Sequence, residues 1–152
     1  TPLAASFMKT VWEVAAVLKH YEISGSDFSA AGEASSNFKL VLKKLGLPAD
    51  VVRKVAISMY EAEINTVIHG GGGTCDAEIS DKSIVISFND NGPGIKDIDL
   101  AMKEGYSTAT DQVRELGFGA GMGLPNMKKY ADDLQIKTTP GKGTTVVLTI
   151  NL

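Results

Sequence analysis

The 152-residue sequence predicts an α+β fold, a two-layer sandwich with helices on one face of a mixed, largely antiparallel sheet. Two observations predict it. Apolar residues recur at helical spacing through most of the first half, and they alternate with a period of two in most of the second half. The elements also come in a characteristic order, with helices first, then two strands, a loop region, one helix and two closing strands.

The first half carries three helical segments and one short strand. Val11, Val14, Ala15 and Leu18 have helical spacing, so residues 1–18 are expected to be an N-terminal extension containing a helix. Glycines terminate the later helices, as they commonly do at helix C-termini. The expected elements are a helix at 8–18, a strand at 19–24, a helix at 29–45, and a longer helix at 48–69 that the glycine run 70–73 stops.

The second half changes to strand periodicity. A tight turn joins its first two strands, and its last two strands form a hairpin around the segment 141–143. Between the second and third of these strands lies a glycine- and charge-rich stretch whose central part, 104–121, is long for a compact domain and is expected to be a lid. The expected elements are strands at 77–80, 83–90, 134–140 and 144–152, and helices at 96–103 and 124–133.

Composition excludes several classes of protein. The formal net charge is -3 and no stripe of Lys or Arg stands out, which disfavours direct binding of nucleic acid. No apolar run approaches the roughly 20 residues that a membrane span needs. The chain has one cysteine, Cys75, so it has no internal disulfide framework. These features predict a cytoplasmic protein without a membrane segment.

Glu61 and Asn65 are the first pair of residues that could carry chemistry. They are four residues apart on a predicted helix and therefore share one face. A carboxylate can take a proton from a hydroxyl or water, and an amide oxygen can ligate Mg²⁺. The alternative is a solvated helix face, since both residue types are common there. Glu63 falls on a different face and is expected to be exposed to solvent.

The segment DNGPGI, residues 90–95, follows directly after an apolar strand. Asp90 at the strand end could accept a hydrogen bond from an exocyclic amine such as that of adenine. Gly92 and Gly94 would let the backbone approach a ligand closely. The alternative is an ordinary β-turn, because Asn-Gly and Pro-Gly are common turn dipeptides.

A second glycine-rich segment, GFGAGMGLPNM at 117–127, leads into a predicted helix. Free backbone N–H groups at a helix N-terminus form a phosphate cradle. The segment is neither a Walker A loop nor a Rossmann fingerprint, because no Gly-Lys-Ser/Thr follows it and no strand immediately precedes it. A flexible loop is the alternative. GKGTTV, at 141–146, taken alone indicates only a hairpin turn.

In this order the four motifs resemble those of the GHKL superfamily, whose members bind Mg-ATP in a Bergerat-type pocket. The resemblance extends from about residue 20 to the end, so residues 19–152 are expected to form one ATP-binding domain. Within the superfamily the chain looks most like the anti-sigma-factor serine/threonine kinases. The segments 57–71, 121–132 and 141–146 carry that likeness.

The resemblance implies a role for each matching residue. Glu61 would be the general base, Asn65 the Mg²⁺ ligand, and Asp90 the carboxylate that reads adenine, with Gly94 closing over the base. Either Thr144 or Thr145 would assist at the adenine through its hydroxyl. The other residues placed at the nucleotide are Gly92, Ile95, Arg114, Gly119, Gly121, Met122, Gly123 and Leu124.

Two features depart from the family or stay open. The anti-sigma kinases carry a basic residue very near the G-x-G, whereas the nearest one here is Arg114, several residues earlier. Arg114 could still reach a γ-phosphate, since guanidinium suits bidentate phosphate contact. His69 would either sit near the phosphates or serve a structural role at its helix C-terminus.

The resemblance thus predicts an ATP- and Mg²⁺-dependent serine/threonine protein kinase. Its substrate would be a small anti-anti-sigma-type domain, a sigma factor would be a second, sequestered partner, and the chain would form a homodimer. Two alternatives use the same pocket: an ATP-gated binding switch or regulatory ATPase without kinase activity, and a detached histidine-kinase catalytic domain. Glu61 and the His69-Gly70 pair argue against the second, because sensor kinases commonly carry Asn at the position of Glu61.

Overall fold

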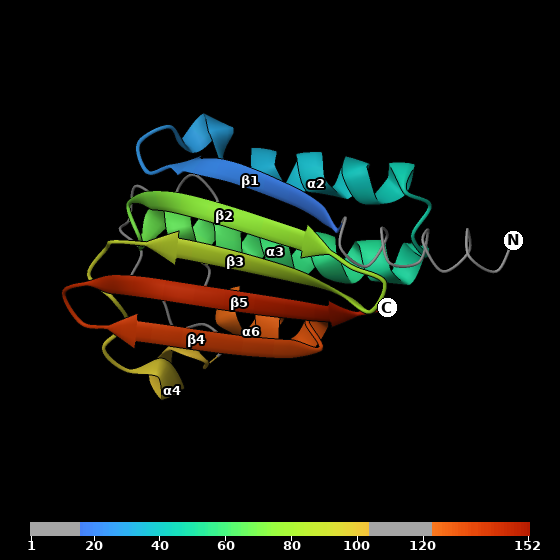
Figure 1. The fold of residues 1–152 in the computed structure, drawn as a ribbon. Coiled ribbons are helices and arrows are strands. Elements are labelled where there is room, and N and C mark those ends of the chain that lie inside the picture. Colours follow the sequence, from blue (N-terminus) through green and yellow to red (C-terminus); the bar gives the residue numbers. More distant parts are fainter. Residues whose placement is uncertain (1–15, 104–122) are drawn as a thin grey trace, which may run out of the picture.

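The computed structural model describes residues 16–103 and 123–152, which form two layers (Figure 1). One layer is a five-stranded sheet with the order β1-β2-β3-β5-β4. The other consists of helices α2, α3 and α6, which all lie on the same side of the sheet. The predicted α+β sandwich is confirmed. The expected mixture of strand directions is not seen in the described part of the chain, where all four strand pairs are antiparallel.

Each strand turns alternate residues toward the helices. In β3, for example, Ile84, Ile86 and Phe88 are buried between the layers, and the residues between them lie on the open face. The same alternation in β5 buries Val146, Leu148 and Ile150. The strand bounds are β1 Val17–Ser24, β2 Gly72–Ile79, β3 Ser83–Asp90, β4 Asp133–Thr139 and β5 Gly143–Asn151.

Helix α3 is the centre of the second layer. It packs against the sheet, against α2 on one side and against α6 on the other (Figure 1). Its inward face includes Val55, Met59 and Ala62, which are fully or almost fully buried. The helical elements are the 3-10 turn η1 Phe28–Ala30, α2 Glu33–Lys44, α3 Ala49–Ile68, α4 Ile98–Ala101 and α6 Gly123–Tyr130. Pro48 precedes α3, as predicted.

The beginning of the domain differs from the prediction. Val17 and Leu18, expected at the end of a helix, belong to β1 and pair with Ile79 and Glu78 of β2. Val17 and Leu18 extend the pairing that residues 19–24 make with β2. This pairing gives their backbone N–H and C=O groups hydrogen-bond partners, and it outweighs the helical spacing of the apolar residues. The rest of the expected N-terminal helix, in 1–15, lies outside the described residues.

The glycine run after α3 ends the helix, but its last two residues already belong to the next strand. Gly72 and Gly73 belong to β2, which therefore begins five residues earlier than the predicted strand at 77–80. A Cβ on Gly73 would lie 2.0 Å from the backbone oxygen of Asn89 on β3, so only glycine fits there. Glycine thus allows the strand to continue where its pattern predicts a break.

Glu63 is the clearest error of the sequence prediction, since its exposed fraction is 2%. Its Oε2 accepts hydrogen bonds from the N–H groups of Gly32 and Ala34, and its Oε1 accepts from the N–H and hydroxyl of Ser35. Gly32 is the N-cap of α2 and, as a glycine, has no side chain that could cap the helix. The Glu63 carboxylate, supplied from α3, therefore satisfies the free N–H groups of α2 and complements its dipole.

Among the residues that the structure describes, no helix is long and apolar enough to cross a membrane.

Candidate functional site

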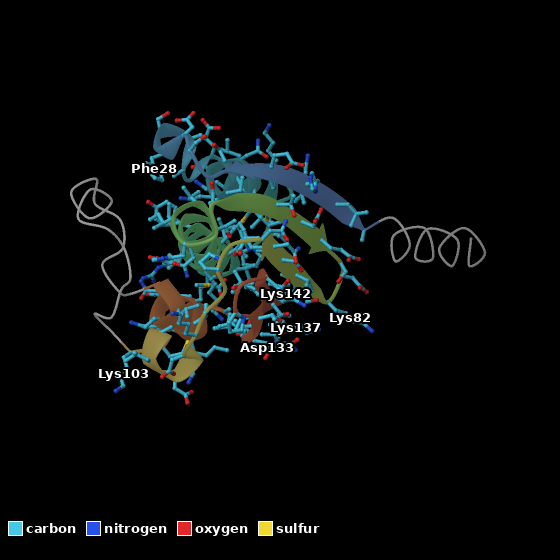
Figure 2. The ribbon with its side chains drawn as sticks, turned by 90° about the vertical axis from the view of Figure 1, so that its left-hand side faces the viewer. Phe28, Lys82, Lys103, Asp133, Lys137 and Lys142 are labelled. Carbon is cyan, nitrogen blue, oxygen red and sulfur yellow. The ribbon has the colours of Figure 1, made fainter. Side chains whose placement is uncertain are left out.

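The predicted site residues gather at one end of the sheet. β1, β3 and β4 end there, β2 and β5 begin there, and α3 ends there as well (Figure 1). Figure 2 looks at the molecule from this end, with Lys142 of the β4–β5 turn labelled. The motifs DNGPGI and GKGTTV meet here because β3 and β5 are antiparallel neighbours, with Asp90 opposite Thr144.

Asp90 is the last residue of β3 and is held by two backbone groups. Its Oδ1 accepts a hydrogen bond from Gly92 N–H at 2.9 Å and another from Thr144 N–H at 3.2 Å. The first bond closes an Asx-type turn, and the second ties this turn to the start of β5. Both fix the direction of the carboxylate, which is half-buried. A carboxylate held in this way can accept a hydrogen bond from a ligand amine without further ordering.

The structure separates the two threonines between which the sequence could not choose. Thr144 is buried and its hydroxyl lies 3.0 Å from that of Thr138 on β4. Thr145 points to the opposite face of the sheet, where its hydroxyl donates to Asn89 Oδ1 at 2.7 Å. Only Thr144 therefore lies on the same face as the Asp90 turn.

Thr138 is a polar member of this end that the motifs do not include. Its Oγ1 accepts a hydrogen bond from Ile95 N–H at 2.8 Å, besides meeting the Thr144 hydroxyl. It thereby joins β4, β5 and the DNGPGI segment at one point. The signal was present in the sequence, since Thr138 continues the inward alternation of Leu134 and Ile136, but a threonine in a strand is too common to stand out.

Close backbone approaches explain two of the predicted glycines. Gly94 has a φ of +76°, and a Cβ there would lie 2.6 Å from the backbone oxygen of Thr139. A Cβ on Gly92 would lie 2.8 Å from Gly70 at the end of α3. The DNGPGI segment is therefore packed between the α3 terminus and the β4–β5 turn, where a side chain would push it away.

Glu61 and Asn65 lie on α3 and face the start of α6. Asn126 Nδ2 of α6 donates a hydrogen bond to Glu61 Oε1 at 3.2 Å. One turn earlier on α6, a Cβ on Gly123 would lie 3.1 Å from Asn65 Oδ1. Glu61 and Asn65 are both half-buried. The helix pair thus brings a carboxylate and an amide to one partly open face, as their spacing predicted.

His69 caps the C-terminus of α3, where its backbone N–H donates a hydrogen bond to the Asn65 backbone oxygen at 2.9 Å. Burial lowers the pKa of its imidazole below 6.5, and the negative charge of Asp90 opposes that shift. A lowered pKa keeps the ring neutral near pH 7, so His69 adds no positive charge to this end of the molecule.

The remaining predicted residues divide into two groups. Ile95 and Leu124 are described: Leu124 belongs to the hydrophobic core, and Ile95 packs against it. The others lie outside the described residues, as does the predicted lid at 104–121. They are Arg114, Gly119, Gly121 and Met122. Within the described part, no cluster of three or more His, Cys, Asp or Glu side chains could hold a metal ion. Cys75 is fully buried and burial raises the pKa of its thiol, so the thiol stays protonated near neutral pH.

A fixed carboxylate, a buried threonine and close-packed glycines meet at one end of this helix-backed antiparallel sheet, which is the arrangement expected of a nucleotide-binding α+β domain. Comparison with known proteins gives the family. The model of the family described as "Histidine kinase-, DNA gyrase B-, and HSP90-like ATPase" matches residues 50–152. The chain belongs to this family, and ATP is accordingly the nucleotide that it binds.

Several similar proteins are anti-sigma F factors. The chain is 41% identical to the anti-sigma F factor of Thermoanaerobacter sp. (strain X514) over 101 residues. The aligned region covers 63% of this chain and 66% of the relative. The chain is 30% identical over 113 residues to that of Clostridium novyi (strain NT), covering 70% and 76%. The chain thus spans slightly less than two thirds of the length of the Thermoanaerobacter relative.

Two solved structures share the fold at low identity. The RsbU and RsbW domains of Rv1364c from Mycobacterium tuberculosis match 88% of the chain and 32% of theirs, with a TM-score of 0.61 and 17% identity. The SiaB-SiaC complex from Pseudomonas aeruginosa contains a chain that matches 98% of this one and 96% of its own, with a TM-score of 0.59 and 12% identity. These matches support the fold alone.

Proposed function

We propose that the chain is an Mg-ATP-dependent serine/threonine protein kinase of the anti-sigma-factor type, which phosphorylates a small partner protein. The observation that carries the proposal is the placement of Glu61 and Asn65 on one partly open face of α3, beside the start of α6. A general base and a cation ligand are among the protein groups that such a transfer needs. The similarity to anti-sigma F factors supports the regulatory setting.

The nucleotide end of the site is assigned to Asp90 and Thr144. Asp90 would accept a hydrogen bond from the adenine amine, and Thr144 would offer its hydroxyl beside it. Gly94 would lie against the base, and its positive φ and the 2.6 Å approach that a Cβ would make to the Thr139 backbone oxygen mean that this turn accepts only glycine. The 3.0 Å contact between the Thr144 and Thr138 hydroxyls keeps the Thr144 side chain in place.

Asn65 is the residue that fits the magnesium ion. Mg²⁺ commonly keeps several waters and binds through one or two protein oxygens together with substrate phosphates. A single amide oxygen next to the start of α6 would satisfy that requirement, and N–H groups at the helix N-terminus would be available to the phosphates. When bound, the ion would neutralise charge on the phosphate oxygens.

The transfer follows from these positions. Glu61 takes the proton of the partner's serine hydroxyl as the serine oxygen forms a bond to the γ-phosphorus. The bond from that phosphorus to the β–γ bridging oxygen breaks, and ADP leaves with that oxygen. Positioning and charge neutralisation supply most of the acceleration, as in other phosphoryl transfers.

The partners belong to the same proposal. The phosphate acceptor is expected to be an anti-anti-sigma-type domain, with a sigma factor as the sequestered partner and a homodimer as the working form. A cytoplasmic setting is also proposed, consistent with the reduced, buried thiol of Cys75.

The test is intact-mass analysis of the chain and a candidate anti-anti-sigma partner after incubation with Mg-ATP. The expected result is one phosphate on the partner, stable to acid, and absent when Glu61→Ala replaces the wild type. Glu78→Ala, which removes an exposed carboxylate from β2, is the matched control and should transfer normally. Binding of ATP without transfer would indicate the ATP-gated switch, and an acid-labile phosphate would indicate a histidine-kinase catalytic domain.

A further inference from the structure

The pairing of α3 with α6 aligns two residues of each helix. Gly123 lies beside Asn65, and Asn126 lies beside Glu61. The residue number rises from 123 to 126 along α6, while the number of the residue that it contacts on α3 falls from 65 to 61. The two helices therefore run in opposite directions, with their turns side by side. Three and four residues each correspond to about one helical turn. One turn of α6 therefore contacts both residues of the predicted catalytic pair.

The contact from Asn126 is a charge-assisted hydrogen bond. Its Nδ2 donates to Glu61 Oε1 at 3.2 Å in a partly buried position, and it comes from an element far away in the sequence. Hydrogen bonds to a charged acceptor are stronger than neutral ones, and partial burial strengthens them further. Three rotatable bonds otherwise leave a glutamate carboxylate free to sample several directions.

We infer that Asn126 is a positioning residue for Glu61. It holds Oε1, so that the other carboxylate oxygen faces the incoming hydroxyl and takes the proton. This inference rests on the proposed role of Glu61 as the base. Asn126 itself touches neither the nucleotide nor the acceptor in this account; it acts through the direction in which it holds the carboxylate.

The kinetic test combines single and double variants. Asn126→Leu keeps the side-chain shape but removes the donor, and it should lower kcat about 10-fold while ATP affinity and the KM for ATP stay unchanged. In a Glu61→Gln background the same change should alter the residual rate by less than about twofold, because the two residues act as a unit. Asn126→Gln, which restores an amide, should recover part of the rate. Lys128→Ala, at an exposed position of the same helix, is the control.

A nuclear magnetic resonance measurement tests the contact without turnover. The side-chain amide signals of Asn126, assigned through their loss in Asn126→Leu, should shift in Glu61→Gln and stay unchanged in Glu78→Gln. Normal kcat in Asn126→Leu, or a full additional loss in the Glu61→Gln background, would overturn the inference and leave the proposed function standing. An active Glu61→Gln enzyme would overturn the assignment of Glu61 as the base and with it the positioning role of Asn126. Unshifted amide signals would show that Asn126 does not contact Glu61 in solution.

Discussion

Glu61 and Glu63 lie two residues apart on the same helix, yet their surroundings differ completely. Glu63 points toward α2, is 2% exposed, and accepts four hydrogen bonds from the start of that helix. Glu61 points toward α6, is half-buried, and accepts one described bond from Asn126. Two residues correspond to a rotation of about 200° around an α-helix. The direction of the side chain therefore decides which carboxylate holds the fold and which is available for chemistry.

Replacing Glu61 is expected to have the largest effect. Glu61→Gln should reduce phosphate transfer by about 10³-fold, the usual contribution of a general base. The free energy of unfolding should change by less than about 1 kcal/mol, because the amide oxygen can still accept the Asn126 bond. A transfer assay and urea unfolding on the same preparation measure both quantities. If Glu61→Gln lost transfer activity only because it lost stability, Glu61 would hold the fold as Glu63 does, and the proposed difference between the two carboxylates would be wrong.

Replacing Glu63 should give the opposite result. Glu63→Gln removes the charge and sets an NH₂ group against N–H donors, so the free energy of unfolding should fall by about 3 kcal/mol. In a domain of this size that corresponds to a melting temperature lower by about 6–12 °C. The matched control is Glu33→Gln, an exposed glutamate in the first turn of α2. A Glu63→Gln protein as stable as this control would contradict the capping role.

The fold was largely predictable because its signals are local. The helix at 48–69 and the strands at 83–90, 134–140 and 144–152 follow from periodicity, and the structure places their ends within one or two residues. The capping role of Glu63 was not predictable, since it depends on which helix packs beside α3. The same limit applies to Asn126, whose partner Glu61 lies 65 residues away in the chain, and to Thr138, whose partner Ile95 lies 43 residues away. Local propensity contains no information on such pairs.

The two threonines offer a smaller and sharper comparison. Thr144→Val should weaken ATP binding about fivefold, the typical cost of one neutral hydrogen bond, because its hydroxyl lies on the Asp90 side of the sheet. Thr145→Val removes a hydroxyl from the opposite face, where it pairs with Asn89, and should leave the affinity unchanged. Calorimetric titration of both variants with Mg-ATP measures the difference. A larger loss in Thr145→Val would reverse the assignment.

The two histidines should give the smallest effect, as opposite contributions to stability. Burial lowers the folded-state pKa of His69 below 6.5, so the unfolded chain takes up the proton first and stability declines as pH falls below about 6.5. Hydrogen bonds to Glu22 and then to Asp76 raise the pKa of the exposed His20, so its contribution is present below 6.5 and is lost at higher pH. His69→Asn should therefore flatten the pH dependence of urea unfolding between about pH 5 and 6.5. An unchanged slope in that interval would contradict this reading of His69.

Calorimetric titration of the wild-type chain with Mg-ATP tests the central claim most directly, with Asp90→Asn as its comparison. Asp90 is a predicted ligand whose carboxylate is held in place by two backbone N–H groups. ATP should bind saturably, with one ATP per chain, and a folded Asp90→Asn variant should bind it at least 10-fold more weakly. Absence of binding to the wild type, or equal affinity in the two proteins, would contradict it.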